Sequence, residues 1–210
     1  MTLRRLILLR HGQTDYNVRG RMQGHLDSRL TSVGEEQAAA AAPVLAALAP
    51  DLMISSDLRR AADTAEAVGA ASGLPVKFDA RLRETHLGRW QGLTVGEIDR
   101  AEPGAIAAWR SDPTWAPPGG ESRVEVVARA RPVVDELDAE LADAEEDSTT
   151  VLLVAHGGCI AGLVTGLMEL PTASWPSFGG LGNCRWAVLA RRADHPRWRL
   201  AGYNVGASDR

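Results

Sequence analysis

The stretch LLRHGQTDYN, from Leu8 to Asn17, changes from apolar to polar within three residues. Its first residues end an apolar run that begins at Leu6, which is typical of a buried strand. Arg10 and His11 follow directly, and Gly12 lets the chain turn. Open α/β sheets bind ligands beyond the carboxyl ends of their strands. A strand that ends in a fixed cation and an imidazole therefore predicts a ligand site at that end.

Two later segments repeat this arrangement of a short strand followed by polar residues. DLMIS (51–55) leads into Ser56, and TVLLVA (150–155) leads into His156-Gly157-Gly158. Helical patterns separate these strands, so the chain is predicted to be α/β: a three-layer α/β/α sandwich with a largely parallel sheet, in one domain over residues 1–210. We expect the three strand ends to converge on one crevice.

Capping residues and prolines predict where the helices begin and end. Thr31 is expected to cap an alanine-rich helix that reaches about Ala49 and that Pro43 kinks or splits. Ser56 or Asp57 is expected to cap the next helix. The other expected elements are a helix end near Gly73, a strand at 76–78, a helix capped by Thr94, a helix from Pro103 to Ser111, a helix from Ser122 to Ala142 interrupted by Pro132, a helix over 158–168, and strands at 185–190 and 197–203.

Composition excludes several functional classes. The net charge is −4, and the arginines are scattered rather than clustered, so no nucleic-acid partner is expected. Cys159 and Cys184 do not form a disulfide framework, and the N-terminal apolar run is too short for a signal peptide. Residues 148–168 lack Asp, Glu, Lys and Arg, but their strand–turn–helix pattern argues against a membrane span. A cytoplasmic protein without a membrane partner is expected.

Nucleotide, serine-hydrolase and metal signatures are absent from the sequence. No G-x-x-x-x-G-K-[ST] or G-x-S-x-G motif occurs, which excludes a P-loop and a nucleophile elbow. The histidines show no H-x-H or H-E-x-x-H spacing, and Arg10 beside His11 disfavours a second cation. We expect neither a metal nor another cofactor.

The polar residues that are present suit a phosphate group. Arg59 and Arg60 lie in the first turn of a helix, whose N-terminus adds backbone donors. Guanidinium groups bind phosphate by paired hydrogen bonds and keep their charge at any pH. His156 adds a second imidazole. Adjacent cations disfavour a protonated imidazole, so Arg10 is expected to keep His11 uncharged and able to attack phosphorus.

Glu84, in the irregular segment RLRETHLGRWQG (81–92), is the best candidate for a proton donor. It would protonate the leaving oxygen and then, as a carboxylate, activate water against the phosphohistidine. Each signal by itself is common in structural roles, since strand-end histidines, helix-start arginines and loop glutamates are usually not catalytic. Their occurrence together in one chain is what predicts an active site.

The motifs LLRHGQTDYN, SSDLRRAADTA, RLRETHLGRWQGLT, GGES and VAHGG resemble, in order and spacing, those of the histidine phosphatase superfamily, which includes cofactor-dependent phosphoglycerate mutases. The resemblance covers nearly the whole chain and implies a phosphoglycerate mutase-like fold and a small phosphorylated substrate. It implies the following roles: His11 as phosphoryl acceptor, Glu84 as proton donor, Arg10, Arg60 and His156 as the phosphate pocket, Asn17 and the Gly157 amide as further phosphate contacts, and Gln23 at the rim. Arg60 is chosen over Arg59 because the pocket arginine of the family directly precedes alanine.

The pattern L-x-E-x-x-x-G-x-W-x-G around Glu84 is similar to the phosphatase branch rather than to the mutases. The segments RHGQTDYN, RMQG, RLRETHLGRWQGLT and TWAPPGGESR are together similar to phosphatases that act on glucosyl-3-phosphoglycerate. The alternatives are a broad-specificity sugar or acid phosphatase, a phosphoglycerate mutase, and a module that binds a phosphorylated ligand without turnover. Ala161 and Gln91 depart from residues that are frequent in the family.

Aromatic residues leave two alternatives open. Trp115, in the loop DPTWAPPGG, is a candidate for contact with a sugar face, or it packs the loop onto the domain. Thr85, His86 and Arg89 are further candidates for substrate contacts. The tryptophans of the C-terminal hairpin, Trp186 and Trp198, form either a homodimer face or part of the core.

Overall fold

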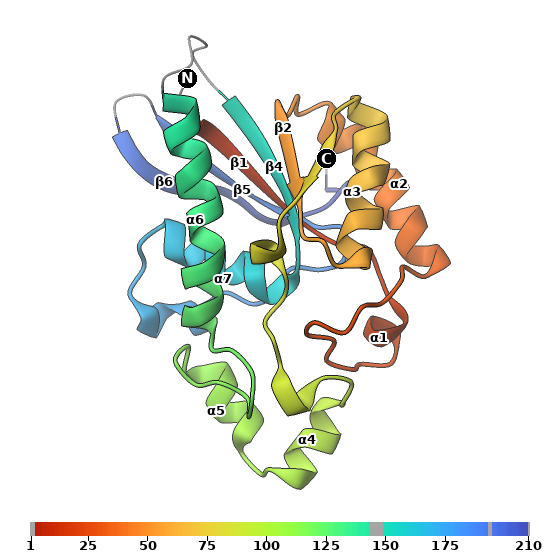
Figure 1. Cartoon of the computed structure of the whole chain (residues 1–210), viewed down its shortest axis with the longest axis vertical. Helices are drawn as coiled ribbons and strands as arrows, with labels where there is room; N and C mark the ends of the chain where they lie inside the picture. The colour runs from red at the N-terminus through yellow and green to blue at the C-terminus, as the bar shows by residue number, and fades with distance from the viewer. Residues whose placement is uncertain (1–2, 143–148, 193–194, 210) are drawn as a thin grey trace.

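A six-stranded sheet with the order β3-β2-β4-β1-β5-β6 forms the centre of the molecule (Figure 1). The computed structural model describes residues 3–142, 149–192 and 195–209. β1 pairs with β4 in parallel and with β5 in antiparallel orientation, so the sheet is mixed but mostly parallel, as predicted. The strands are β1 (Leu3–Arg10), β2 (Leu52–Ser55), β3 (Val76–Phe78), β4 (Thr149–Ala155), β5 (Trp186–Arg192) and β6 (His195–Val205).

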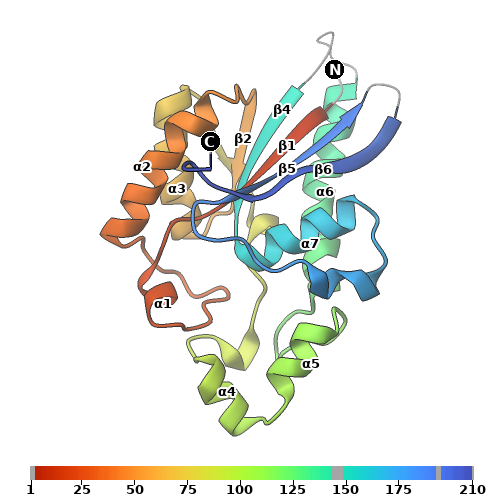
Figure 2. The same ribbon diagram turned by 180° about the vertical axis from the view of Figure 1, so that it is seen from behind.

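Helices cover both faces of the sheet, which confirms the three-layer arrangement (Figure 2). Side chains alternate across β1: Leu6 and Leu8 join the core cluster under α6 and α7, whereas Ile7 and Leu9 join the cluster under α2 and α3. The helices are α1 (Asp15–Val18), α2 (Ser32–Ala46), α3 (Arg59–Ser72), α4 (Val95–Ala101), α5 (Ala105–Ser111), α6 (Arg123–Ala142) and α7 (Gly157–Leu167).

Neither internal proline interrupts its helix, so a split at Pro43 and a break at Pro132 are wrong. The other alternative at Pro43, a kink, stays a prediction. Thr31 caps α2 as predicted, by accepting a hydrogen bond from the Gly34 amide at 3.1 Å. A proline inside a helix removes one backbone hydrogen bond. In α6 this loss is offset by packing, since Val133 and Val134, directly after Pro132, are buried against the sheet.

The start of α3 also differs from the prediction. The capping position is Leu58 rather than Ser56 or Asp57, and the Asp27 carboxylate accepts a hydrogen bond from the Arg59 amide at 2.8 Å. Asp57 instead pairs with Arg83, with 2.7 Å between Oδ1 and Nε. A residue 32 positions away thus supplies the cap, and Ser56 is available for another contact. The helix ends where predicted, with Gly73 in the left-handed conformation (φ 74°).

Helices α4 and α5 form a cap at the carboxyl-end side of the parallel strands, with a small core of its own (Figure 1). Thr94 caps α4 as predicted, whereas α5 begins at Ala105, two residues after the predicted Pro103. Trp115 stacks on Trp90 within this core, with ring centroids 5.3 Å apart and an interplanar angle of 30°. The loop-packing alternative for Trp115 therefore matches its position.

The C-terminal hairpin of β5 and β6 contributes to the core rather than standing apart. Trp186 is buried in the cluster under α2 and α3, and the Arg191 guanidinium lies 4.6 Å from the ring centroid of Trp198. Core packing thus explains Trp186, and the homodimer through this hairpin stays a prediction.

Among the described residues, no helix has the length and apolarity needed to cross a membrane. Ser148, the first residue of the uncharged 148–168 segment, lies outside the described residues.

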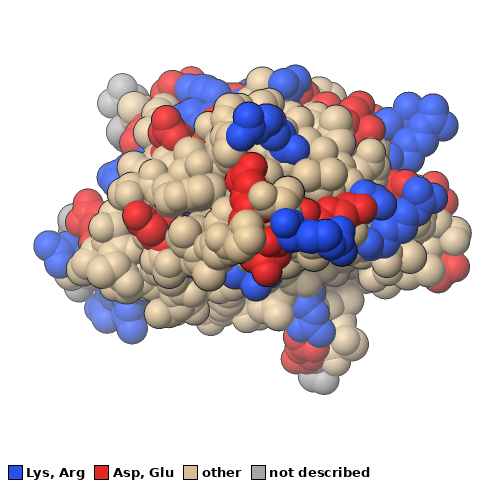
Figure 3. All heavy atoms as spheres, turned by 90° about the horizontal axis from the view of Figure 1, so that it is seen from below, with Lys and Arg blue, Asp and Glu red and all other residues tan. Residues whose placement is uncertain are grey.

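Acidic and basic side chains are intermingled on the face seen from the α4–α5 end (Figure 3). Basic groups on this face alternate with acidic groups at short range, and the net charge of the chain is −4. That no nucleic acid is a partner stays a prediction.

Candidate active site

The carboxyl ends of β1, β2 and β4 converge as predicted, and two adjoining cavities open beside them. The inner cavity, of about 200 Å³, is lined by His11, Asn17, Gln23 and Arg60 among others. The outer cavity, of about 450 Å³, lies on the α7 side. Arg10, Glu84, Thr85, Trp109 and Gly158 line both cavities, so the two form one continuous site.

His11 is buried at the inner cavity and held in one tautomer. Its Nδ1 lies 2.7 Å from the Gly12 carbonyl oxygen, which can only accept, so Nδ1 carries the proton and Nε2 is free. Burial, followed by the charges of Arg10 and Arg60, holds the pKa of His11 well below its usual value. The ring is therefore uncharged at neutral pH and has an unprotonated nitrogen, as a nucleophile requires.

Two buried guanidinium groups flank this imidazole. Arg60 has no exposed surface and donates to the Gly24 and Leu26 carbonyls at 2.8 and 2.9 Å. Arg10 donates to the Leu181 carbonyl. Within the described residues neither arginine pairs with a carboxylate, and Nε of each is buried without a partner. Burial lowers the pKa of both, that of Arg60 to about 10, and an unpaired buried charge is costly. The pair therefore favours an anion.

The second imidazole, His156, lies against the first. The ring centroids of His11 and His156 are 5.2 Å apart, and the ring planes are tilted by 57°. His156 is fully buried and lines neither cavity directly. Its Nε2 lies 2.9 Å from Oγ of Ser56, and its Nδ1 has no partner. Burial and the charge of Arg60 are the main causes that keep its pKa well below the usual value.

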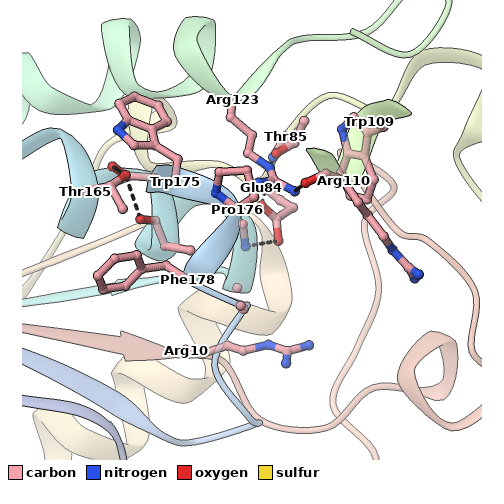
Figure 4. A pocket seen from close by; sticks show the side chains of 16 residues that line it. Arg10, Glu84, Thr85, Trp109, Arg110, Arg123, Thr165, Trp175, Pro176 and Phe178 are labelled. Atoms are coloured by element: carbon pink, nitrogen blue, oxygen red, sulfur yellow. Dashed lines mark hydrogen bonds between the residues drawn. The ribbon is translucent and has the colours of Figure 1, made fainter. Parts of the chain in front are cut away.

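Glu84 lies between the two cavities and faces the N-terminus of α7 (Figure 4). Its carboxylate accepts from the amides of Thr85, Gly158 and Cys159 at 2.9 to 3.0 Å. Glycine is needed at position 158, because a Cβ there would lie 2.7 Å from Oε1 of Glu84. The sequence motifs around Glu84 and His156 thus meet through backbone amides, a contact that spacing along the chain did not indicate.

Arg129 of α6 fixes the segment that carries Glu84. Its guanidinium donates to the carbonyls of Arg81, Arg83 and Glu84 at 2.7 to 2.9 Å, and it pairs with Glu121 at 2.7 Å. His25 holds the same segment from the other side, with its Nε2 2.7 Å from the Glu84 carbonyl. Because every donor of Arg129 is used, the backbone at Glu84 has a defined position relative to α7.

Gln91, which departs from the common family residue, also supports this region. Its Oε1 accepts from the His25 amide at 2.6 Å, so it fixes the loop next to the carbonyl that binds Arg60. The other departure, Ala161, lies in the wall of the outer cavity. A methyl group there leaves space that a longer side chain would fill.

The remaining predicted substrate contacts are divided between the cavities. Asn17 and Gln23 line the inner cavity, and Gly157 lines the outer one. Oδ1 of Asn17 accepts from Thr14 and Asn183, so its amide nitrogen is left for a ligand. The structure does not bring Trp115 to either cavity, because its ring is engaged with Trp90 in the α4–α5 core.

The other candidates for substrate contact also differ in whether they line a cavity. Thr85 lines both cavities, whereas His86 and Arg89 line neither. Arg89 is largely exposed and lies 3.7 Å from Glu102. Sequence reasoning missed most of the outer cavity, including Trp109, Arg123, Trp175 and Phe178 (Figure 4). No signal in the sequence distinguishes Trp109 from Trp115, although Arg123 directly follows the GGES motif.

No three His, Cys, Asp or Glu side chains of the described residues are grouped as a metal site. Cys159 and Cys184 are both buried and unpaired with each other, and burial raises the pKa of each thiol to about 12. Neither thiol is thus poised as a nucleophile or metal ligand. That the chemistry needs no metal stays a prediction.

Comparison with known proteins agrees with this geometry. Residues 6–205 match the model of the histidine phosphatase superfamily, branch 1. The chain belongs to the histidine phosphatase superfamily. It is 55% identical to the glucosyl-3-phosphoglycerate phosphatase of Mycobacterium tuberculosis, over 99% of this chain and 97% of the relative.

Solved structures of mycobacterial glucosyl-3-phosphoglycerate phosphatase are similar to that of this histidine phosphatase. A mycobacterial glucosyl-3-phosphoglycerate phosphatase in complex with VO3 superposes with a TM-score of 0.92 at 56% identity, over 97% of this chain and 100% of the other. The complex of that phosphatase with inorganic phosphate gives 0.89 at 55% identity, over 97% and 98%. The phosphoglycerate mutase-like fold expected from the sequence is thereby confirmed.

Proposed function

We propose that this histidine phosphatase hydrolyses phosphomonoesters through a phosphohistidine at His11, with glucosyl-3-phosphoglycerate as its substrate and glucosylglycerate as the product. The single observation that carries the reaction type is an uncharged, tautomer-fixed imidazole beside two buried arginines that lack a carboxylate partner. The substrate is supported by 55% identity over nearly the full length to a phosphatase with that name.

In the first step Nε2 of His11 attacks phosphorus, while Arg10 and Arg60 neutralise the phosphoryl oxygens. The bond between phosphorus and the leaving oxygen breaks, and that oxygen takes a proton from Glu84. Glu84 suits this role because it lines both cavities and stands where the phosphoryl group and the leaving group would meet.

In the second step the Glu84 carboxylate removes a proton from water, and the hydroxide attacks the phosphohistidine. The bond between phosphorus and nitrogen breaks, the electron pair returns to Nε2, and inorganic phosphate leaves. Three backbone amides hold the carboxylate in place for this step. The amide of Gly157 and the side chains of Asn17 and Gln23 would add contacts to the phosphate, and His156 would stabilise it from the second strand end.

The proposal is tested by measuring phosphate release from glucosyl-3-phosphoglycerate, 3-phosphoglycerate, glucose 6-phosphate and p-nitrophenyl phosphate, with and without a chelator. We expect the first to be hydrolysed with the highest kcat/KM, activity to persist with chelator, and His11→Asn to be inactive. Rapid trapping at neutral pH should give a label on His11. A label on another residue, or loss of activity with chelator, would overturn the mechanism.

The two rival functions give different results in the same experiments. A mutase would convert 3-phosphoglycerate to 2-phosphoglycerate when primed with a bisphosphoglycerate, with little release of phosphate. A binding module would bind inorganic phosphate without turning over any ester. A broad-specificity phosphatase would hydrolyse all four esters at comparable kcat/KM. The cytoplasmic location stays a prediction.

A further inference from the structure

The outer cavity carries more positive charge than the proposed chemistry uses. Arg10, Arg110 and Arg123 line it, and among its lining residues, all of them described, Glu84 is the only acidic one. Glu84 is already engaged with three backbone amides. The phosphoryl group belongs in the inner cavity beside His11, so the charge of the outer cavity faces the leaving group of the substrate.

Arg123 has a fixed backbone position at the first residue of α6. Ser122 and Glu125 form a capping box around it: the Ser122 amide donates to the Glu125 carboxylate at 2.7 Å, and the Glu125 amide donates to Oγ of Ser122 at 3.2 Å. The guanidinium lies 5.5 Å from the ring centroid of Trp109 and donates to the Arg110 carbonyl at 3.3 Å. The cap and the indole together orient this side chain.

Arg123, like Arg10 and Arg110, lines the cavity without a carboxylate paired to it among the described residues. Nearby arginines are neutralised: Arg129 by Glu121 at 2.7 Å and Arg83 by Asp57. In the described part of the chain no carboxylate pairs with Arg123, and burial lowers its pKa without an acidic neighbour to offset that effect. Figure 4 shows its guanidinium reaching toward Glu84 and Thr85, whereas that of Arg110 points away from the other lining side chains.

A second donor in this wall is also unpaired. Among the described residues, Nε1 of Trp109 is buried without a hydrogen-bond partner, and Trp109 lines both cavities. One guanidinium fork matches one carboxylate in geometry and charge. A phosphate dianion is better served by two arginines, as in the inner cavity.

We propose that Arg123 binds a carboxylate on the leaving group of the substrate, so that the enzyme selects phosphomonoesters of hydroxy acids over those of neutral alcohols. This inference rests on the proposed phosphatase function and names the residue that recognises the non-phosphoryl part of the substrate. Trp175, Pro176 and Phe178 are the apolar part of the cavity lining. Of Arg110 and Arg123, the one whose guanidinium reaches toward Glu84 is Arg123 (Figure 4).

The test compares 3-phosphoglycerate with glycerol 3-phosphate, which has a hydroxymethyl group in place of the carboxylate. A charge-assisted hydrogen bond predicts a 10- to 100-fold preference of the wild type in kcat/KM for the carboxylate. Arg123→Gln should lower kcat/KM for 3-phosphoglycerate to near that for glycerol 3-phosphate and leave the latter within about twofold. Arg123→Lys should restore part of the preference.

Arg100→Gln is the charge-matched control, because Arg100 is exposed on α4 and lines neither cavity. It should keep the wild-type preference. An Arg123→Gln variant that loses equally on both esters, or a wild type without a preference, would overturn the inference.

A binding measurement tests the role of Arg123 without depending on turnover. Dissociation constants are measured by calorimetric titration with the hydrolysis-resistant phosphonate analogues of both esters. In the wild type, the analogue with the carboxylate should bind more tightly by the same factor as the preference in kcat/KM. In Arg123→Gln, the two analogues should bind equally. Absence of phosphate release from every ester would refute the proposed function alone, whereas an unchanged ratio in the variant would refute the carboxylate subsite alone.

Discussion

Nε2 of His156 and Oγ of Ser56 lie 2.9 Å apart, although 100 residues separate them in the chain. Ser56 Oγ also accepts from the Leu58 amide at 3.3 Å, which leaves its proton and its second lone pair for Nε2 of His156. Nδ1 of His156 is buried without a partner among the described residues, so the bond to Ser56 is the side-chain hydrogen bond of this ring. Ser56 thus holds the imidazole of His156 beside that of His11.

Ser56→Ala should therefore lower kcat/KM about tenfold, the cost of about 1.4 kcal/mol for one lost hydrogen bond. The ring of His156 would then populate both tautomers, which ¹⁵N NMR of the imidazole would detect. Ser55→Ala is the matched control, because Ser55 is equally buried but its hydroxyl bonds only the Ser56 carbonyl. A variant with normal activity and a single tautomer of His156 would contradict this role.

Gly158→Ala should displace the Glu84 carboxylate, because the new Cβ would lie 2.7 Å from Oε1 of Glu84 and 3.2 Å from Oγ1 of Thr85. The amide of residue 158 is kept, so the effect isolates the position of the carboxylate. We expect kcat for alkyl phosphates to fall at least tenfold and that for p-nitrophenyl phosphate, whose leaving group needs no proton, to fall less. Steady-state kinetics on both esters measures this.

Gly96→Ala serves as the control, since no heavy atom lies within 4 Å of its Cβ position on α4. Its kinetics should match the wild type. Equal losses on both esters for Gly158→Ala would mean that the substitution disturbs phosphate binding instead of proton donation.

Arg129→Lys should loosen the Glu84 segment, because a single ammonium cannot replace a guanidinium that holds three carbonyls and one carboxylate. The loss of a half-buried network should lower the free energy of unfolding by about 1–3 kcal/mol. It should also lower kcat while the affinity for inorganic phosphate stays within about twofold. Urea denaturation and phosphate inhibition measure the two effects.

Arg131→Lys on the same helix is the comparison for Arg129. Arg131 pairs with Asp135 at 3.3 Å at the surface, where ion pairs contribute little. Its stability and kinetics should stay near those of the wild type. If both lysine variants behaved alike, the carbonyl contacts of Arg129 would not be what fixes Glu84.

Stability should decrease on acidification from about pH 6.5 to pH 5. The pKa values of His11 and His156 are well below the ordinary value in the folded protein, so these two side chains bind up to two more protons in the unfolded chain in this window. The free energy of unfolding then falls by up to about 2.7 kcal/mol per pH unit as pH falls. Urea denaturation at half-unit steps of pH measures this slope.

His156→Asn should remove about half of that slope, since one of the two buried imidazoles is gone. His195→Asn is the control, because His195 is exposed at the start of β6. It should leave the slope unchanged. A wild-type stability that is flat between pH 6.5 and pH 5 would contradict the uncharged state of both rings.

The sequence by itself determined the fold and which residues are proposed as the reacting groups. Apolar runs that stop at Arg10, at Ser55 and at Ala155 require buried strands with polar ends, and parallel strands put those ends on one edge. Hydrophobic periodicity depends on residues that are close in the chain, so the sequence alone is enough to recognise it. The same holds for Thr31 and Thr94, whose caps act within four residues.

Only the tertiary structure decided the contacts that cross the chain. Asp27 caps α3 from 32 residues away, Pro132 is tolerated because α6 packs on the sheet, and Trp109 rather than Trp115 reaches the cavity. The tautomer of His156, the amides around Glu84 and the unpaired charge of Arg123 depend on side chains meeting in three dimensions. Hydrogen bonds and ion pairs act over a few ångströms of space, and distance along a sequence does not report that separation.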